Sequence, residues 1–583
     1  MDENVIKLIQ NSINIKNNNE SINEYLNRYG VDNFITALAE IYWDNISEVS
    51  NYFKNNIPQN NTSKNERVIA LYYNRIYNGG TERVVSVLSN KLSNIIDSNN
   101  NCYKYHVVLI TDNEKTPYDY DLDDKVVREY LPDFYSYTHK NYYYRCQAWQ
   151  NIIDKYDIDI VISSAWIYTS TFWDALAVKL SKKQPAFCIH QHAYAGNIYM
   201  FSHMNPYEIF SKYQICDGIV TLSNSDCEYA KTYNNNVVNI DNPWFIDPCK
   251  TPEKNYKGFN ILWLGRISYE KRPEDAIEVM HYVVKQIPEA KLYMVGSSTE
   301  ISQKEIDLRV KKYNLENNII MPGFTKNIEY YYNLANVFIV TSESEGYPMV
   351  MGESLTYGVP VITYDLPWLS HIEDGRGIIT VEHGNYKKMA EEVVALLRDN
   401  YRLKEVGKKG KIHAIEAFNK DIYSEWSSFI HNSIHNNNIN KLNDVNHINY
   451  YYVAKFDNMA RRDLINKNIY LQSKLKEQSN YQKKFYLNII LQKNVVIFGN
   501  SKTDIEKIKE ININKQIIFI NIYNDQTINL TTCMNYMKEN RNKNNIYVMM
   551  VSSAYNQVKN IFIQHGYKED DNFINGNVLF ECY

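Results

Sequence analysis

Short runs of β-branched and aromatic residues alternate with amphipathic stretches along most of this chain of 583 residues, and this alternation restricts the fold more than any other feature. It is typical of parallel α/β units, in which each strand is followed by a helix. A polar, proline-containing interruption near residues 243–258 divides the alternation into two blocks. The sequence therefore predicts an α/β protein with two Rossmann-like domains that face each other across a cleft.

The expected strands end in loops that carry the residues of interest. In the first block the strand candidates are VIALYY, YHVVLIT, DIVISSA, AFCIH, GIVTLS and VVNI, and in the second they are FNILWLG, KLYMVG, NIIMPG, VFIVTS and PVITYD. We expect a helical appendage over 1–62, α/β domains over 63–248 and 249–434, a partly helical linker over 435–492 and a small Rossmann-like module over 493–583. The last module lacks a GxGxxG fingerprint, which favours a non-catalytic role.

Composition and charge exclude several classes of protein. The 63 basic and 67 acidic residues give a net charge of −4, which implies no general field for polyanions, and we expect no nucleic-acid partner. The 8 cysteines include no CxxC pair, which is typical of reduced thiols in a cytoplasmic protein. We expect a cytoplasmic location, because the N-terminus lacks a signal-peptide pattern and no apolar run approaches the roughly 18 residues of a membrane span.

Two carboxylates at a fixed spacing flank an expected helix start in TSESEGYPMVMGESLTYGVPVI. Gly346 allows a tight turn after the preceding strand, and Pro348 suits the first helical position. The free N–H groups of the first helical turn would form an anion site at the positive end of the helix dipole. Glu345 is expected in the loop over the cleft and Glu353 on the helix along the cleft wall. The plain alternative is that both acids are solvated surface residues.

Two further motifs supply cations and glycines at strand ends. In ILWLGRISYEKRPEDAI, a buried strand delivers Arg266 and Lys271 into the following loop, where a guanidinium fork and a point charge together would neutralise a diphosphate. In YNGGTERVV, Gly79 and Gly80 precede an expected helix, and paired glycines let a ligand approach the backbone closely. Taken alone, each motif is more often an ordinary surface loop or turn.

The order and spacing of these motifs resemble those of retaining glycosyltransferases of family 4, which have the two-domain GT-B fold. The residues that carry the resemblance are GGTERV in the first domain, GRISYEK at the start of the second, and ESEGYPMVMGESLTYGVPVI, in which Glu345 and Glu353 form a Glu-x7-Glu pair. The resemblance extends over residues 67–434. It implies that the first domain binds the acceptor and the second binds the nucleotide-sugar donor.

The resemblance also implies a role for each motif residue. Arg266 and Lys271 would hold the donor diphosphate and stabilise the leaving nucleoside diphosphate. Glu345 would contact the transferred sugar near the reacting carbon, and Glu353 would hydrogen-bond the donor ribose. Gly80 would lie close to the donor phosphates or the acceptor, with Gly79 as a further candidate. The backbone that would cradle the sugar and phosphate comprises Gly346, Tyr347, Pro348, Met349 and Val350.

A histidine and an asparagine complete the expected site. The family usually has a histidine at the end of a first-domain strand, and in QPAFCIHQHAYAG we expect this to be His190, with His192 as a rival. The ordinary alternative for either histidine is a loop residue or a core residue whose hydrogen bonds are satisfied. Asn242 in IDNPW falls where the family commonly has Pro-Asn-Pro, and the change to Asp-Asn-Pro leaves its role open.

The resemblance implies transfer of a sugar, of hexosyltransferase type, from a nucleotide-sugar to a surface glycan, cell-wall polymer or lipid-linked acceptor. A UDP-sugar is the expected donor and the only co-substrate; no cofactor is expected. No metal is expected either, because no Asp-x-Asp motif follows a strand and Arg266 and Lys271 supply positive charge. A lipid-linked acceptor implies peripheral contact with the inner membrane face. Front-face attack and double displacement both remain open.

Three alternatives stay beside this interpretation. A nucleotide-sugar epimerase on the same fold would need no polymeric acceptor. A glycoside phosphorylase would need pyridoxal phosphate on a lysine, for which the chain has no local signature. A non-catalytic scaffold with a decayed site is disfavoured by the joint presence of Glu345, Glu353, Arg266 and Lys271.

Overall fold

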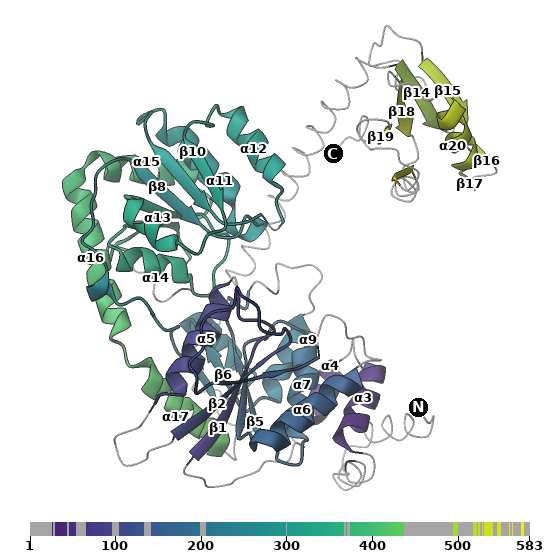
Figure 1. The fold of residues 1–583 in the computed structure, drawn as a ribbon, viewed down its shortest axis with the longest axis vertical. Coiled ribbons are helices and arrows are strands. Elements are labelled where there is room, and N and C mark those ends of the chain that lie inside the picture. The colour runs from purple at the N-terminus through teal and green to yellow at the C-terminus, as the bar shows by residue number, and fades with distance from the viewer. Residues whose placement is uncertain are drawn as a thin grey trace. The chain divides into compact units, whose positions relative to one another are not determined.

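The computed structural model describes residues 30–42, 46–53, 66–95 except 78, 104–132, 142–196, 206–298, 300–366 and 374–435, a few single residues between them, and short segments from 494 to 575. The chain divides into two compact units, Met1–Ala460 and Arg461–Tyr583. The first unit holds the two larger sheets, which Figure 1 labels by strand. Apart from His435, the expected linker over 435–492 lies outside the described residues.

The first domain is built on a parallel seven-stranded sheet in the order β3-β2-β1-β4-β5-β6-β7. Every expected strand of the first block forms. The sheet also has an edge strand that was not predicted, β3, because its sequence VREY contains two charged residues and lacks the apolar pattern of a strand. The strands are β1 (Glu66–Tyr72), β2 (Lys104–Thr111), β3 (Val127–Tyr130), β4 (Ile160–Ser163), β5 (Ala186–His190), β6 (Gly218–Thr221) and β7 (Val237–Asn239). All four residues of β4 are buried, as expected for a central strand covered on both faces.

Helices cover both faces of this sheet (Figure 1). They are α5 (Gly80–Leu92), α6 (Tyr142–Tyr156), α7 (Ser170–Lys179), α9 (Pro206–Ser211) and α10 (Asn224–Ala230), with a 3₁₀ turn, η3, at Lys212–Gln214. The described part of the N-terminal appendage, α3 (Val31–Tyr42) and α4 (Ile46–Phe53), packs beside α6, α7 and α9. Because Ile35, Leu38 and Val49 are fully buried in the same core cluster, these helices belong to the first domain's core.

The second domain contains a six-stranded parallel sheet in the order β10-β9-β8-β11-β12-β13. Its strands are β8 (Asn260–Leu264), β9 (Lys291–Val295), β10 (Ile319–Gly323), β11 (Val337–Val340), β12 (Val361–Tyr364) and β13 (Ile378–Val381). Its helices are α11 (Pro273–Val283), α12 (Gln303–Lys312), α13 (Ile328–Leu334), α14 (Met349–Thr356), α15 (Tyr386–Arg398) and α16 (Asn400–Phe418). The predicted α/β class with parallel sheets is confirmed.

The end of the range predicted for the second domain packs on the first domain. After α16, helix α17 (Ile422–His435) buries Trp426, Phe429 and Ile430 in the core cluster that contains β1 and β2 residues. The Trp426 ring meets His190 of β5 edge-on, with ring centroids 5.0 Å apart. The range 249–434 therefore includes a helix of the first domain, because the apolar face of α17 is covered there.

The second unit holds a small parallel sheet in the order β15-β14-β18-β19. Its strands are β14 (Asn494–Gly499), β15 (Ile517–Asn521), β18 (Asn545–Met549) and β19 (Phe573–Asn575), accompanied by the two-stranded β16 (Tyr523–Asn524) and β17 (Thr527–Ile528) and by α20 (Leu530–Glu539). Three of these parallel strands have the sequences NVVIFG, IIFIN and NIYVM and lie within the module expected over 493–583. Parallel strands of this kind are typical of a Rossmann-like module.

Candidate active site

The loop after β8 brings a lysine to the carboxylate of Glu345. The chain leaves β8 through Gly265 and forms a 3₁₀ turn, η5, at Tyr269–Lys271. Lys271 Nζ lies 2.7 Å from Glu345 Oε1, and the two side chains are 19% and 9% exposed. Burial alone would lower the pKa of Lys271, but the carboxylates of Glu345 and Glu270 outweigh it and the pKa is raised. The lysine is therefore a fixed positive charge at the strand ends.

The turn after β11 fixes Glu345 against this loop. Ser342 Oγ donates to Glu345 Oε1 at 2.6 Å, so that this oxygen accepts from both the serine and the lysine. Thr341 Oγ1 makes 2.9 Å contacts with the carbonyl oxygens of Lys271 and Arg272. The carboxylate and the cation are thus held by hydrogen bonds between two neighbouring strand-end loops.

Arg266 lies in the same loop but does not reach Glu345. Its side chain is 54% exposed, and Arg266 Nη2 lies 3.5 Å from Glu270 Oε2. Lys271 Nζ lies 3.4 Å from the other oxygen of Glu270. The two predicted cations are therefore brought together through one carboxylate, with Lys271 in the buried position and Arg266 in the solvated one.

The helix after Gly346 starts one residue later than expected. Pro348 is the N-cap, with φ −73° and ψ 92°, and α14 begins at Met349. The hydroxyl of Tyr347 accepts a 2.8 Å hydrogen bond from Trp244 Nε1. A small cavity borders this helix, and its lining residues are Trp244, Phe245, Ile246, Tyr347, Met349, Gly352, Glu353 and Thr356.

Gly346 of the second domain lies directly against the backbone of the loop after β5. A Cβ at Gly346 would lie 2.1 Å from the carbonyl oxygen of His192 and 2.6 Å from Ala193 Cα. Real Cβ atoms do not approach backbone so closely, and backbone cannot swing away as the end of a side chain can. A residue without a side chain is therefore required where the two domains meet.

The two candidate histidines lie in different surroundings. His190 is 2% exposed, and neither of its ring nitrogens has a hydrogen-bond partner among the described residues. His192 is half-buried, its ring is 3.9 Å from that of His190, and its Nε2 lies 3.0 Å from Ser164 Oγ. Burial lowers the pKa of His192 to about 3 and that of His190 well below its usual range, so both imidazoles are neutral at pH 7. Because its backbone meets Gly346, His192 is the better placed of the two.

Glu353 is paired across the two domains. Arg83 Nη1, from the first turn of α5, lies 2.8 Å from Glu353 Oε1, and the hydroxyl of Tyr332 in α13 donates to Glu353 Oε2 at 2.9 Å. Burial raises the pKa of Glu353, while Arg83 and Tyr332 oppose that rise. Sequence reasoning missed Arg83 and Tyr332, although Arg83 lies within the GGTERV motif.

The glycine pair of the first domain lies at the start of α5. Gly79 is the N-cap and Gly80 the first helical residue. A Cβ at Gly80 would lie 3.9 Å from Met349 Cγ in the second domain, an ordinary contact distance, so Gly80 faces the start of α14. A Cβ at Gly79 would lie 2.0 Å from Glu82 Oε2, which is an intradomain contact.

Asn242 is 4% exposed, and its Oδ1 has no partner within the described ranges.

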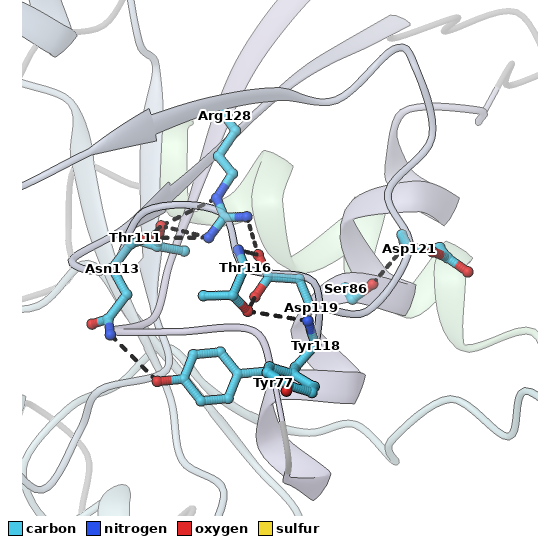
Figure 2. A network of polar contacts seen from close by, with 9 residues as sticks. All are labelled: Tyr77, Ser86, Thr111, Asn113, Thr116, Tyr118, Asp119, Asp121 and Arg128. Atoms are coloured by element: carbon cyan, nitrogen blue, oxygen red, sulfur yellow. Dashed lines mark hydrogen bonds and ion pairs between the residues drawn. The ribbon is translucent and has the colours of Figure 1, made fainter. Parts of the chain in front are cut away.

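Polar contacts brace the loop between β2 and β3 (Figure 2). Arg128 of β3 binds Thr111 Oγ1 at 3.3 Å and pairs with Asp119. Thr116 Oγ1 contacts Asp119 Oδ1 at 2.7 Å, which closes the loop on itself. The next residue, Tyr120, donates its hydroxyl to the carbonyl oxygen of Gly79 at 3.3 Å. The loop therefore holds the backbone in front of α5 in place.

The region that carries Glu345, Lys271 and Glu353 matches a known family. Residues 250–413 match the family model described as glycosyl transferases group 1. These residues form a glycosyltransferase group 1 domain.

None of the described helices is long and apolar enough to cross a membrane.

Two curated relatives of this chain differ in how much of their length is matched. The poly(glycerol-phosphate) alpha-glucosyltransferase of Bacillus subtilis is 29% identical over 36% of this chain, which spans only 32% of that protein. The GalNAc-alpha-(1->4)-GalNAc-alpha-(1->3)-diNAcBac-PP-undecaprenol alpha-1,4-N-acetyl-D-galactosaminyltransferase of Campylobacter jejuni is 23% identical over 60% of this chain and 95% of its own length.

A solved structure shows the fold of the whole region that contains the group 1 domain. A TarM mutant of S. aureus, in complex with fondaparinux, alpha-GlcNAc-glycerol and UDP, superposes with a TM-score of 0.50 and 14% identity. The match covers 63% of this chain and 99% of that one. The predicted GT-B arrangement of two Rossmann-like domains is therefore confirmed.

Proposed function

We propose that this chain is a retaining glycosyltransferase that moves a sugar from a UDP-sugar to a cell-wall polymer, a surface glycan or a lipid-linked acceptor. The observation that carries this proposal is the buried Lys271–Glu345 pair at the strand ends of the group 1 domain, where Gly346 meets the first domain. A fixed cation and a fixed carboxylate at that edge fit a donor whose diphosphate and sugar need different partners.

In this proposal each group has one task. Lys271 and the more exposed Arg266 neutralise the diphosphate as it departs, and Glu345 contacts the sugar near its reacting carbon. The backbone from Gly346 to Val350 and the start of α5 at Gly80 line the donor. Glu353 accepts the ribose hydroxyls. His192, in preference to His190, lines the reaction centre, because its neutral ring is half-buried and its backbone meets Gly346.

The reaction proposed is a substitution at the anomeric carbon. The bond between that carbon and the donor's phosphate oxygen breaks, the acceptor hydroxyl oxygen forms a bond on the same face, and its proton passes to the departing phosphate oxygen. Glu345 Oε1 already accepts from Lys271 and Ser342, which stabilises the carboxylate and makes it a weaker nucleophile. This favours front-face attack over a covalent intermediate. With Lys271 supplying the charge, we propose that turnover needs no metal.

The acceptor class follows from what the relatives are named for. The Bacillus subtilis protein is named for poly(glycerol-phosphate) and the Campylobacter jejuni protein for an undecaprenol-linked glycan. Both acceptors are polymeric or lipid-carried, and the S. aureus structure holds UDP. We therefore propose a UDP-sugar donor, a glycan or lipid-linked acceptor, and peripheral contact with the cytoplasmic membrane face for the lipid-linked case.

A thermal-shift screen against UDP, GDP, ADP and their sugars tests the donor class, because a ligand that binds only the folded state raises its melting temperature. UDP and one UDP-sugar are expected to raise the Tm most. Product analysis by mass spectrometry and proton NMR would then report the transferred sugar and its anomeric configuration, with and without EDTA. No shift with any nucleotide in a folded protein, or an inverted product, would contradict the proposal.

A further inference from the structure

Arg83 reaches from the first domain to a carboxylate of the second. Its guanidinium Nη1 lies 2.8 Å from Glu353 Oε1, and its guanidinium carbon lies 3.6 Å from the centroid of the Phe245 ring. The Arg83 side chain is 27% exposed and that of Glu353 only 7%. Stacked on one side and paired at its tip, the guanidinium has little freedom to leave this position.

The hydrogen bonds of Glu353 leave room for a ligand. A carboxylate offers about four acceptor positions on its two oxygens. Among the described residues, Arg83 occupies one position on Oε1 and Tyr332 one position on Oε2. The remaining two suit a pair of neighbouring hydroxyls, which is what a ribose presents. Glu353 also lines the cavity beside α14, together with Met349, whose Cγ lies near Gly80 of α5.

The pairing depends on both domains. Arg83 and Glu353 are 270 residues apart in sequence, one on α5 and the other on α14. A buried carboxylate that loses its cation is strongly disfavoured. Separation of the domains would leave the Glu353 carboxylate with Tyr332 as its one side-chain partner among the described residues, so both partners are present only when α5 lies against α14.

From this geometry we infer that Arg83 is a positioning residue for the nucleotide part of the donor: it holds one oxygen of Glu353, so that the free acceptor positions are presented to the ribose hydroxyls when the domains are together. This inference rests on the proposed function. It gives the first domain, which the family resemblance assigns to the acceptor, a share in donor affinity.

The test compares full-length variants by titration calorimetry with UDP, GDP and ADP and by donor kinetics. Arg83→Met is expected to weaken UDP binding about tenfold, because a charge-assisted hydrogen bond is lost, and to raise KM more than it lowers kcat. Arg83→Lys should recover part of the affinity. Arg402→Met is the matched control, because Arg402 at the start of α16 pairs with Glu392 of α15 at 2.9 Å and neither residue contacts Arg83 or Glu353 in the described contacts. Its affinity and KM should equal those of the wild type.

A double-mutant cycle separates the inference from the proposed function. If Arg83 acts through Glu353, then Arg83→Met in a Glu353→Gln background should add less than about twofold to the loss of affinity. The inference alone is overturned if Arg83→Met binds UDP as tightly as the wild type does. It is also overturned if the losses of affinity from Arg83→Met and Glu353→Gln are fully additive. Absence of nucleotide binding by the wild type would overturn both. Melting temperatures of all variants establish that each one folds.

Discussion

The two sheets of the first unit bury charge to different extents at the ends of their strands. In the first domain, Arg145 is 0% exposed and binds Asp112 Oδ1 at 2.8 Å and Asp174 Oδ2 at 2.7 Å. Its Nη2 also contacts the hydroxyl of Tyr72 at 2.6 Å, and that of Tyr142 donates to Asp174. The side chains of Arg145, Asp112 and Asp174 are at most 1% exposed, and the cluster joins the ends of β1 and β2 to α6 and α7. Because these charges pair with one another away from solvent, we interpret the cluster as a structural network.

In the second domain, buried charge gathers at the carboxyl ends of the strands. Lys271 and Glu345 pair at 2.7 Å, and Arg272 pairs with Glu343 at 2.8 Å in the same loops. The Lys271 side chain keeps 19% of its surface exposed, whereas that of Arg145 keeps none. In our proposal, the Lys271–Glu345 pair serves the active site because it stays partly open. Enclosed by helices, the same chemistry stabilises the fold.

Arg145→Met should give the largest effect on stability. The substitution leaves Asp112 and Asp174 buried without a cation, and such a break costs about 3–5 kcal/mol. Burial already raises the pKa of Asp112 to about 6 in the presence of Arg145, which shows how costly the charged form is there. Urea denaturation measures the loss. Arg402→Met, which breaks a partly exposed pair, is expected to change the unfolding free energy by less than about 1 kcal/mol.

Lys271→Met should reverse this pattern. With the cation removed, the departing diphosphate loses its buried counter-charge, and kcat should fall about a hundred- to thousandfold. Stability should fall by less than in Arg145→Met, because the partner Glu345 still accepts from Ser342. Donor turnover and urea midpoints together measure both effects. Lys388→Met, which breaks the exposed pair with Glu392 on α15, is the control and should retain turnover. Equal turnover in both variants would remove Lys271 from the site.

The parts of the site that sequence could predict are those encoded by local pattern. Strands that alternate with helices place residues such as Lys271 and Glu345 in neighbouring loops, because the carboxyl ends of parallel strands share one edge. Gly346 was predicted as a turn residue. The structure adds the reason for its identity, which is the backbone of His192 at 2.1 Å from where a Cβ would lie.

The parts that could not be predicted depend on contacts between distant segments. Arg83 and Glu353 form a pair although they lie 270 residues apart in the sequence, and the periodicity of neither helix predicts this pairing. The burial of His190 follows from α17, whose Trp426 returns to the first sheet after the whole second domain has been built. The strand ending in AFCIH placed His190 at its end correctly, but strand position does not tell which histidine a later helix covers.

Gly346→Ala should disturb the contact between the two domains. The new methyl group would collide with the His192 carbonyl and Ala193 Cα, and relief of such overpacking costs about 1–3 kcal/mol. Because the collision is with the other domain, we expect kcat/KM to fall about tenfold or more while the second domain keeps its fold. Gly375→Ala is the control: apart from its chain neighbours, no atom of the described residues lies within 4 Å of its added Cβ, although its φ of +85° brings some strain. Unchanged kinetics in Gly346→Ala would show that the loops do not meet during turnover.

Lys212→Met tests a buried cation of the first domain's core that, unlike Arg145, has no carboxylate paired to it among the described residues. Lys212 is 0% exposed, and its Nζ contacts the carbonyl oxygens of Trp166 and Tyr168 at 2.5 and 2.8 Å, with no carboxylate paired to it among the described residues. Burial lowers the pKa of Lys212 to about 7, while the nearby Cys216 thiol opposes the shift.

The sign of the pH effect follows from proton binding. Between pH 7 and about 10.5 the unfolded chain holds the Lys212 proton and the folded chain has released it, so the free energy of unfolding rises with pH. From pH 7 to 8.5 this contributes about 1–2 kcal/mol to the wild type and nothing to Lys212→Met. Urea midpoints of both proteins at each pH measure the difference. Parallel pH profiles of the two proteins would mean that Lys212 stays charged in the folded chain. Its carbonyl contacts would then have a structural role, as the contacts around Arg145 do.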